Sequence, residues 1–127
     1  MIPTRTPAVG LPRLEIRAWI FSAALSEIEI IGAGIQGILD LTGFNNLIKL
    51  NCSDNYIVSI INLPASLQEL ECKYCILKEL DGLPSSLTKL DCSYNKLMLL
   101  NNLPGNLEEL VCMENILINL DVVLMLI

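Results

Sequence analysis

Leucine and other apolar residues recur along this chain at one fixed interval. Three successive units begin with Leu63-Pro64, Leu83-Pro84 and Leu103-Pro104, and each continues as LPxxLxxLxCxx(N/C)xL. The apolar positions that these units share are Leu67, Leu87 and Leu107, then Leu70, Leu90 and Leu110, then Cys72, Cys92 and Cys112, then Leu77, Leu97 and Leu117. A strict period of this kind predicts a solenoid, in which each unit has the same fold and buries its apolar side chains against its neighbours.

Two more units extend the pattern upstream, and the step between these two is slightly longer than the others. Their apolar positions are Leu25, Ile28 and Ile30, then Leu47, Leu50 and Cys52. Five units therefore cover Leu25 to about Leu120. We expect residues 25–127 to form the solenoid. Residues 1–24 fit the period poorly, and we expect them to form an irregular cap or a degenerate first repeat, with Trp19 and Phe21 over the first apolar layer.

Each unit is predicted to contain one short strand and an extended return. Apolar residues alternate within the LxxLxC segment, which is typical of a strand with one buried face. The rest of each unit has no helical-period stretch long enough for a full helix. Pro64, Pro84 and Pro104 fix φ and lack a donor, so we expect a polyproline-like return or a short 3₁₀ turn on the convex side. The predicted fold is a mainly β, right-handed parallel β-solenoid with five repeats.

The repeat resembles that of the leucine-rich-repeat family, whose consensus is LxxLxLxxN/CxL with roughly 20 to 29 residues per unit. The short period and the Leu-Pro element are similar to repeats of bacterial effector proteins, and the segment Leu90 to Asn95 is similar to repeats of large DNA viruses. This resemblance implies an arc-shaped solenoid whose concave sheet face binds another protein. For an effector or a viral component, it also implies a place in the host cytoplasm.

Composition excludes several classes of protein. The chain has 127 residues, of which 53% are hydrophobic and 17% are charged, so it is not a disordered polar chain. The longest unbroken apolar run is Val122–Ile127, and other runs, such as Ala18–Phe21, are shorter still. All are far shorter than the roughly 20 residues that span a bilayer. Three arginines precede the second run, but this apolar stretch is short and interrupted by Ser22, so we expect no secretion signal.

The charge and the missing histidine narrow the function further. The net charge is −6, whereas a protein that follows a nucleic-acid backbone needs a cationic surface, so nucleic-acid binding is disfavoured. The chain has no His, which is the commonest general base and a common metal ligand. It also has no nucleophile elbow and no phosphate loop. We expect a protein that is not an enzyme and that uses no cofactor and no metal.

The cysteines offer a redox or zinc interpretation, because Cys72 and Cys75 form a CxxC motif. The register favours a structural one. Cys72 occupies the inward strand position of Cys52, Cys92 and Cys112, where a small apolar group fits, and Cys75 occupies a position that is Asn in other units. We therefore expect buried, reduced thiols, which favour an intracellular location. A redox role and a metal site remain the alternatives.

Asparagine recurs where the chain leaves the predicted strand, at Asn55, Asn95 and Asn115. We expect these amides to point inward and to satisfy backbone groups of the adjoining turns, since buried polar groups need partners. The alternative is a row of asparagines that binds a ligand.

The outward positions of the predicted strands form two rows. The third position alternates in sign and contains Glu27, Lys49, Glu69, Lys89 and Glu109. Pairs of opposite charge across a ladder contribute about 0.2 to 1 kcal/mol each, so a solvated, self-neutralising row is favoured over a ligand site. The fifth position contains Glu29, Asn51, Glu71, Asp91 and Val111, and it has no compensating lysine. This acidic row should attract a basic partner.

Tyrosines lie beside the acidic row. Tyr74 and Tyr94 share the eighth position, and Tyr56 occupies the tenth position of the preceding unit. Exposed tyrosines next to charges are typical of protein-binding hot spots, although they could also cover the strand ends. The predicted binding residues for a protein with a basic patch are Glu71, Asp91, Tyr56, Tyr74, Tyr94 and Lys73.

The last residues of the chain are apolar and contain no polar cap, whereas solenoids need capping units with a polar outer face. These residues are Val122, Val123, Leu124, Met125, Leu126 and Ile127. We expect them to be buried, either against the chain's own last unit or against another subunit. The alternative to a protein-binding module is therefore a structural or assembly protein, which forms a homo-oligomer, a larger particle or a filament through uncapped solenoid ends.

Overall fold

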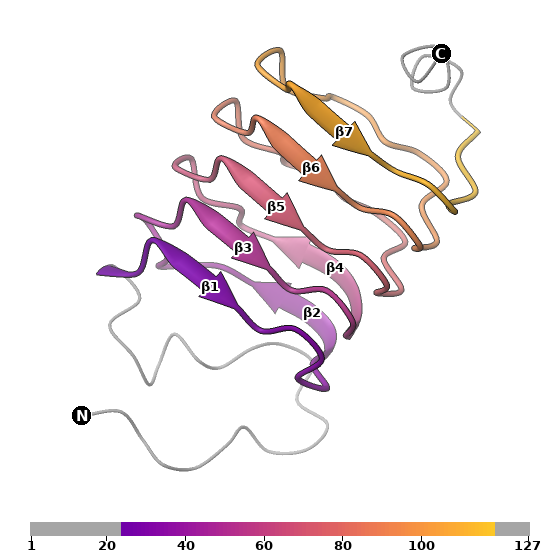
Figure 1. Cartoon of the computed structure of the whole chain (residues 1–127), viewed down its shortest axis with the longest axis horizontal. Coiled ribbons are helices and arrows are strands. Elements are labelled where there is room, and N and C mark those ends of the chain that lie inside the picture. Colours follow the sequence, from indigo (N-terminus) through magenta and orange to yellow (C-terminus); the bar gives the residue numbers. More distant parts are fainter. Residues whose placement is uncertain (1–23, 119–127) are drawn as a thin grey trace.

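The computed structural model describes residues 24–118, and within this range the chain forms two parallel β-sheets and no α-helix. The larger sheet contains one short strand from each unit, in chain order (Figure 1). Its strands are β1 (Glu27–Glu29), β3 (Lys49–Asn51), β5 (Glu69–Glu71), β6 (Lys89–Asp91) and β7 (Glu109–Val111). The smaller sheet pairs β2 (Gln36–Asp40) with β4 (Tyr56–Ile61). The predicted mainly β, parallel β-solenoid is confirmed.

The register of the larger sheet follows the sequence repeat. Leu50 pairs with Leu70, Leu70 with Leu90, and Leu90 with Leu110, so the interval between partners is constant. Between β1 and β3 the interval is longer, because Ile28 pairs with Leu50. Equivalent residues therefore lie side by side along the solenoid, about 4.8 Å apart.

Apolar ladders fill the space inside the coils. Leu67 and Leu87 are fully buried, as are Leu77 and Leu97 in the returns. Complete burial of one such side chain contributes about 1.5 to 3 kcal/mol, so each unit gains stability only by stacking on the next. Phe44 adds the single aromatic ring among the largest buried side chains of the described residues.

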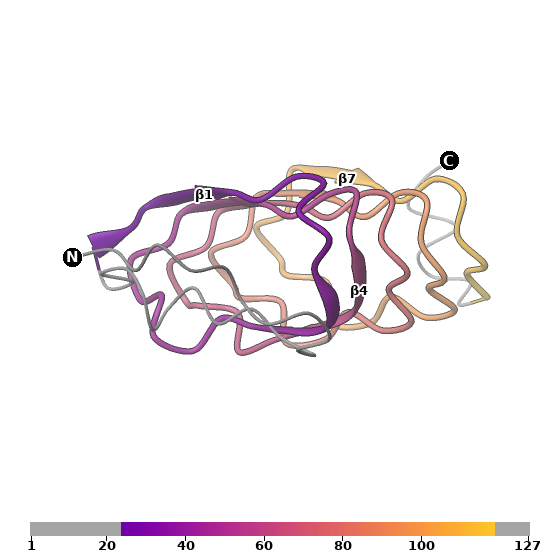
Figure 2. The same ribbon diagram turned by 90° about the horizontal axis from the view of Figure 1, so that it is seen from below.

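The return segments are more regular than expected in the first two units. We predicted an extended or 3₁₀ return, but β2 and β4 form a true parallel pair, with a register shift between Gly37 and Ile38. Later units have an extended return without strand pairing, and a few backbone hydrogen bonds join neighbouring returns, such as Lys96 N to Leu77 O at 2.8 Å. Seen from below, the successive coils follow one another along the axis (Figure 2).

Each Leu-Pro element begins a tight turn. The carbonyl oxygens of Pro64, Pro84 and Pro104 accept hydrogen bonds from the amides of Leu67, Leu87 and Leu107, at 3.1 to 3.2 Å. Proline suits this position because its carbonyl oxygen accepts the hydrogen bond of the turn, and the backbone N–H that proline lacks is not needed there. Phe44 occupies the equivalent position one unit upstream, where its oxygen accepts from Leu47 N at 3.2 Å.

Two expectations fall on residues that the structure does not describe. The predicted N-terminal cap, with Trp19 and Phe21, lies almost entirely outside residues 24–118, and the apolar segment Val122–Ile127 lies entirely outside this range. Both stay predictions. The described part of the chain contains no helix long and apolar enough to cross a membrane.

Candidate functional site

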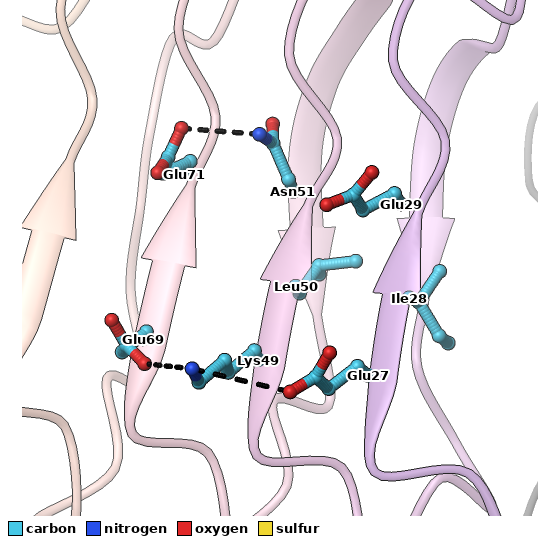
Figure 3. Close-up of a pocket in the computed structure, with 8 residues that line it drawn as sticks. All are labelled: Glu27, Ile28, Glu29, Lys49, Leu50, Asn51, Glu69 and Glu71. Carbon is cyan, nitrogen blue, oxygen red and sulfur yellow. Dashed lines mark hydrogen bonds and ion pairs between the residues drawn. The ribbon is translucent and has the colours of Figure 1, made fainter.

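The third-position row forms a continuous chain of ion pairs across the larger sheet. Lys49 Nζ lies 3.1 Å from Glu69 Oε2 and 3.9 Å from Glu27 Oε1 (Figure 3). Lys89 Nζ lies 3.8 Å from Glu69 Oε1 and 4.0 Å from Glu109 Oε1. The hydrogen bond from Lys49 to Glu69, with the charges of Glu69 and Glu27, raises the lysine's pKa. The row therefore offsets most of its own charge, as its alternation predicted.

The fifth-position row is acidic, but its charge is partly offset. Asn51 Nδ2 donates to Glu71 Oε2 at 3.1 Å (Figure 3). Lys73 Nζ lies 4.0 Å from Asp91 Oδ2, so the expectation that this row has no compensating lysine was wrong. The pattern missed this pair because Lys73 comes from the turn after β5 and reaches across to the neighbouring unit. Glu29 and Glu71 form no ion pair with any residue in the described range, and the row keeps a net negative charge.

A shallow hollow lies between these rows over β1, β3 and β5. Its volume is about 110 Å³, which is well below the roughly 300 to 1,000 Å³ of small-molecule pockets, so it is too small for a drug-sized ligand. Four carboxylates and one lysine give its lining a net charge of −3 (Figure 3). The lining residues are Glu27, Ile28, Glu29, Lys49, Leu50, Asn51, Glu69 and Glu71.

Tyr74 and Tyr94 stack on each other at the carboxyl ends of β5 and β6. Their ring centroids are 4.3 Å apart, and the ring planes differ by 8°. Both side chains are exposed, at 51% and 39%, so the stack presents aromatic surface to solvent. Tyr56 is 60% exposed but begins β4 in the smaller sheet, so the stack does not include it.

The stacked tyrosines have an unusual backbone conformation. Tyr74 and Tyr94 have φ values of 54° and 59°, in the left-handed region. This region costs a bulky L-residue about 1 to 2 kcal/mol, and Gly, Asn and Asp adopt it more readily. The equivalent residues of the neighbouring units, Asp54 and Glu114, share this conformation. The sequence predicted binding at Tyr74 and Tyr94, which share one repeat position, but it did not single out Asp54 and Glu114 at the same position.

The asparagines are structural, as predicted. Asn95 is buried, and its Nδ2 donates to the carbonyl oxygens of Cys72, Cys92 and Ser93 at 2.9 to 3.1 Å. Its Oδ1 accepts from Leu77 N at 3.0 Å. Asn55 and Asn115 make the same kinds of bonds in their own units. Each amide thus joins its own turn to the coil before it.

The cysteines are buried, as predicted, and all of them are free thiols. Burial raises the pKa of Cys92 to about 12 and that of Cys72 well above its ordinary value, so these thiols are neutral near pH 7. Cys75 occupies the repeat position held by Asn55, Asn95 and Asn115 in other units, and its Sγ donates to Cys52 O at 3.3 Å. The described residues contain no group of three or more potential metal ligands.

Comparison with known proteins gives no further guide to the site. No protein-family model, no curated protein and no solved structure matches the chain significantly.

Proposed function

We propose that this chain is a leucine-rich-repeat module that binds a protein partner through the outward face of its five-stranded sheet. The observation that carries the proposal is the pairing of two unlike features on this face. Glu29 and Glu71 form no ion pair with the described residues, and the exposed stack of Tyr74 and Tyr94 lies at the ends of the neighbouring strands. Carboxylates attract a partner, and tyrosines bury large contact areas.

The charge distribution indicates what the partner presents. The third-position row satisfies its own charges and offers little to a ligand, since exposed pairs contribute at most about 1 kcal/mol. The fifth-position row and the acidic hollow instead favour a partner with lysine or arginine side chains. The hollow is too small for a drug-sized ligand, which supports binding of a protein rather than catalysis on a small molecule. Buried, reduced thiols support an intracellular location.

Peptide selection with charge-reversal variants tests this proposal. Peptides that bind the immobilised chain are selected from a random display library, and their affinity is measured for the original chain, Glu71→Lys and Glu79→Lys. Glu79 is a matched control, because it is exposed and lies beside β4 in the smaller sheet, where Ser59 Oγ donates to its Oε1 at 3.4 Å.

The proposal predicts cationic peptides whose binding weakens about tenfold or more in Glu71→Lys, weakens with rising salt, and is unchanged in Glu79→Lys. Selected peptides without cationic residues, or equal effects of the two variants, would contradict it.

A second candidate function is assembly through the last coil, which one observation favours. The ladder positions Leu107 and Leu110 are only partly buried, whereas Leu87 and Leu90 in the preceding unit are buried. Exposed apolar side chains gather in the same region, namely Met98, Leu99, Val111, Met113, Ile116 and Ile118.

Stacking of β1 from a second copy on β7 is disfavoured, because in the sheet's register Glu27 would face Glu109. Head-to-tail stacking of identical copies is therefore disfavoured. Sedimentation velocity of the chain alone tests this point: a monomer agrees with the electrostatic argument, and open-ended polymers would refute it.

A further inference from the structure

A column of four equivalent residues follows the strands of the larger sheet. Asp54, Tyr74, Tyr94 and Glu114 occupy successive units, and all four have φ between 54° and 59°. Backbone hydrogen bonds join the column, from Asp54 N to Lys73 O at 2.9 Å, from Tyr74 N to Ser93 O at 3.1 Å and from Tyr94 N to Met113 O at 2.8 Å. The two aromatic rings are therefore flanked by one carboxylate at each end.

The fold does not require tyrosine at these positions. A second left-handed column in the same coils contains Asn62, Gly82 and Asn102, which adopt this conformation at little strain. The chain thus uses suitable residues where only the backbone conformation matters. Two adjacent tyrosines in the first column keep an unfavourable conformation, and such strain is typical of functional positions.

The stack leaves one face of each ring available. The rings lie 4.3 Å apart and nearly parallel, so their inner faces cover each other and their outer faces are directed toward the neighbouring units. Asp54 and Glu114 occupy those units, and neither forms an ion pair with the described residues. Both tyrosines are exposed, at 51% and 39%, so the stack keeps ring surface that a ligand can contact.

The charges around the stack favour a cation. The carboxylates in the turns around the stack are Asp54, Asp91 and Glu114, and Lys73 lies 4.0 Å from Asp91. Asp54 and Glu114 form no ion pair with the described residues, so their negative charges are not offset by a salt bridge. Desolvation and a hydrogen bond with the Tyr94 side chain raise the pKa of Tyr74, and the charge of Asp54 adds to this effect. Asp54 is therefore close enough to act on the ring.

We propose that this column is a binding site for an arginine side chain of the protein partner. The inference rests on the proposed function and names the chemistry that this part of the surface recognises. A planar guanidinium stacks on the outer face of Tyr74 or Tyr94 and donates hydrogen bonds to the adjacent carboxylate. Lysine binds less well, because its compact ammonium is more strongly hydrated and cannot stack.

Ring chemical shifts of the chain's tyrosines test the proposal directly. The chain labelled with ¹³C-tyrosine is titrated with the blocked tripeptide Gly-Arg-Gly and separately with Gly-Lys-Gly. We expect the Tyr74 and Tyr94 signals to shift on addition of the arginine peptide. The affinity obtained from these shifts should be about threefold higher than that for the lysine peptide. Tyr56 is an internal control, because it lies in β4 and outside the stack, and its signal should not move.

Two sets of variants separate the ring faces from the carboxylates. Asp54→Asn with Glu114→Gln should weaken the arginine peptide and abolish its preference over lysine. Tyr74→Asn with Tyr94→Asn should abolish binding without unfolding the chain, because asparagine suits the left-handed conformation.

Equal shifts with both peptides, shifts of Tyr56 of the same size, or unchanged binding after loss of both carboxylates would overturn the arginine site. If the arginine site is overturned but the selected library peptides still require Glu71, the proposed function stands without the arginine site. If the peptides do not require Glu71, the proposed function and the arginine site both fail.

Discussion

Asn95 provides the sharpest test of how the repeat is held together. Its side chain is 6% exposed and joins its own turn to the preceding coil through four hydrogen bonds. The substitution Asn95→Ala removes all four. The amide of Leu77 and the carbonyl of Cys72 then have no replacement partner in the described structure, and a buried polar group that loses its partner costs about 1 to 3 kcal/mol. We therefore expect a loss of about 2 to 6 kcal/mol in the free energy of unfolding.

Asn106→Ala is the matched control. Asn106 is exposed and donates one bond, from Nδ2 to Ser85 O at 3.1 Å, so its replacement should cost less than about 0.5 kcal/mol. Equilibrium urea unfolding, followed by far-UV circular dichroism, measures both changes. Hydrogen exchange at the Leu77 amide gives a local measure, and it should accelerate only in Asn95→Ala. Equal stability losses in the two variants, or unchanged exchange at Leu77, would refute the structural role of the asparagine column.

Three more predictions concern buried residues, namely Cys75 at the repeat position of the asparagines, Leu90 and Cys92. Cys75→Asn should stabilise the chain by about 1 kcal/mol in the same unfolding assay, because an amide can donate to Cys52 O and accept from Ile57 N. A loss of stability would show that the position cannot hold the larger side chain. Leu90→Ala should cost about 2 to 5 kcal/mol, since Leu90 is 2% exposed, whereas Leu99→Ala, at 48% exposure, should cost less than about 1 kcal/mol. Stability should fall as pH rises above the ordinary thiol pKa of 9.0 toward the folded value of about 12 for Cys92, because the folded state holds this proton more tightly than the unfolded chain. Chemical unfolding between pH 7.5 and 10.5 checks the sign. The free energy of unfolding should fall less steeply with pH in Cys92→Ala than in the original chain, and parallel curves for the two proteins would contradict the prediction.

The sequence predicted the larger sheet well because one physical rule governs it. Leu70 and Leu90 must face inward for the units to stack, and the constant interval between such leucines then determines the register of the strands. The buried cysteines and asparagines followed from the same register. No comparable rule applies to the returns, where the pairing of β2 with β4 depends on a local shift at Gly37 that the apolar pattern does not encode.

The surface was predicted less completely, because side chains there reach across units. Lys73 approaches Asp91 from a turn and Asn51 donates to Glu71, so the acidic row is less uniform than its composition indicates. The pattern placed Tyr74 and Tyr94 in one column, but the ring stacking depends on backbone conformation. Tyr56 illustrates the converse. Its tenth repeat position lies close to the eighth position of Tyr74 and Tyr94, and the prediction grouped the three, but Tyr56 begins β4 in the smaller sheet.

The central claim is that the outward face of the five-stranded sheet binds a cationic protein partner, and chemical-shift mapping tests it most directly. The ¹⁵N-labelled chain is titrated with a peptide selected by binding to the immobilised chain, and the perturbed backbone amides are assigned. The account predicts that perturbations concentrate in β3, β5 and β6 and in the turns that carry Tyr74 and Tyr94, with β2 and β4 unchanged. Perturbations confined to β2 and β4, or to the last coil around Ile116, would contradict it.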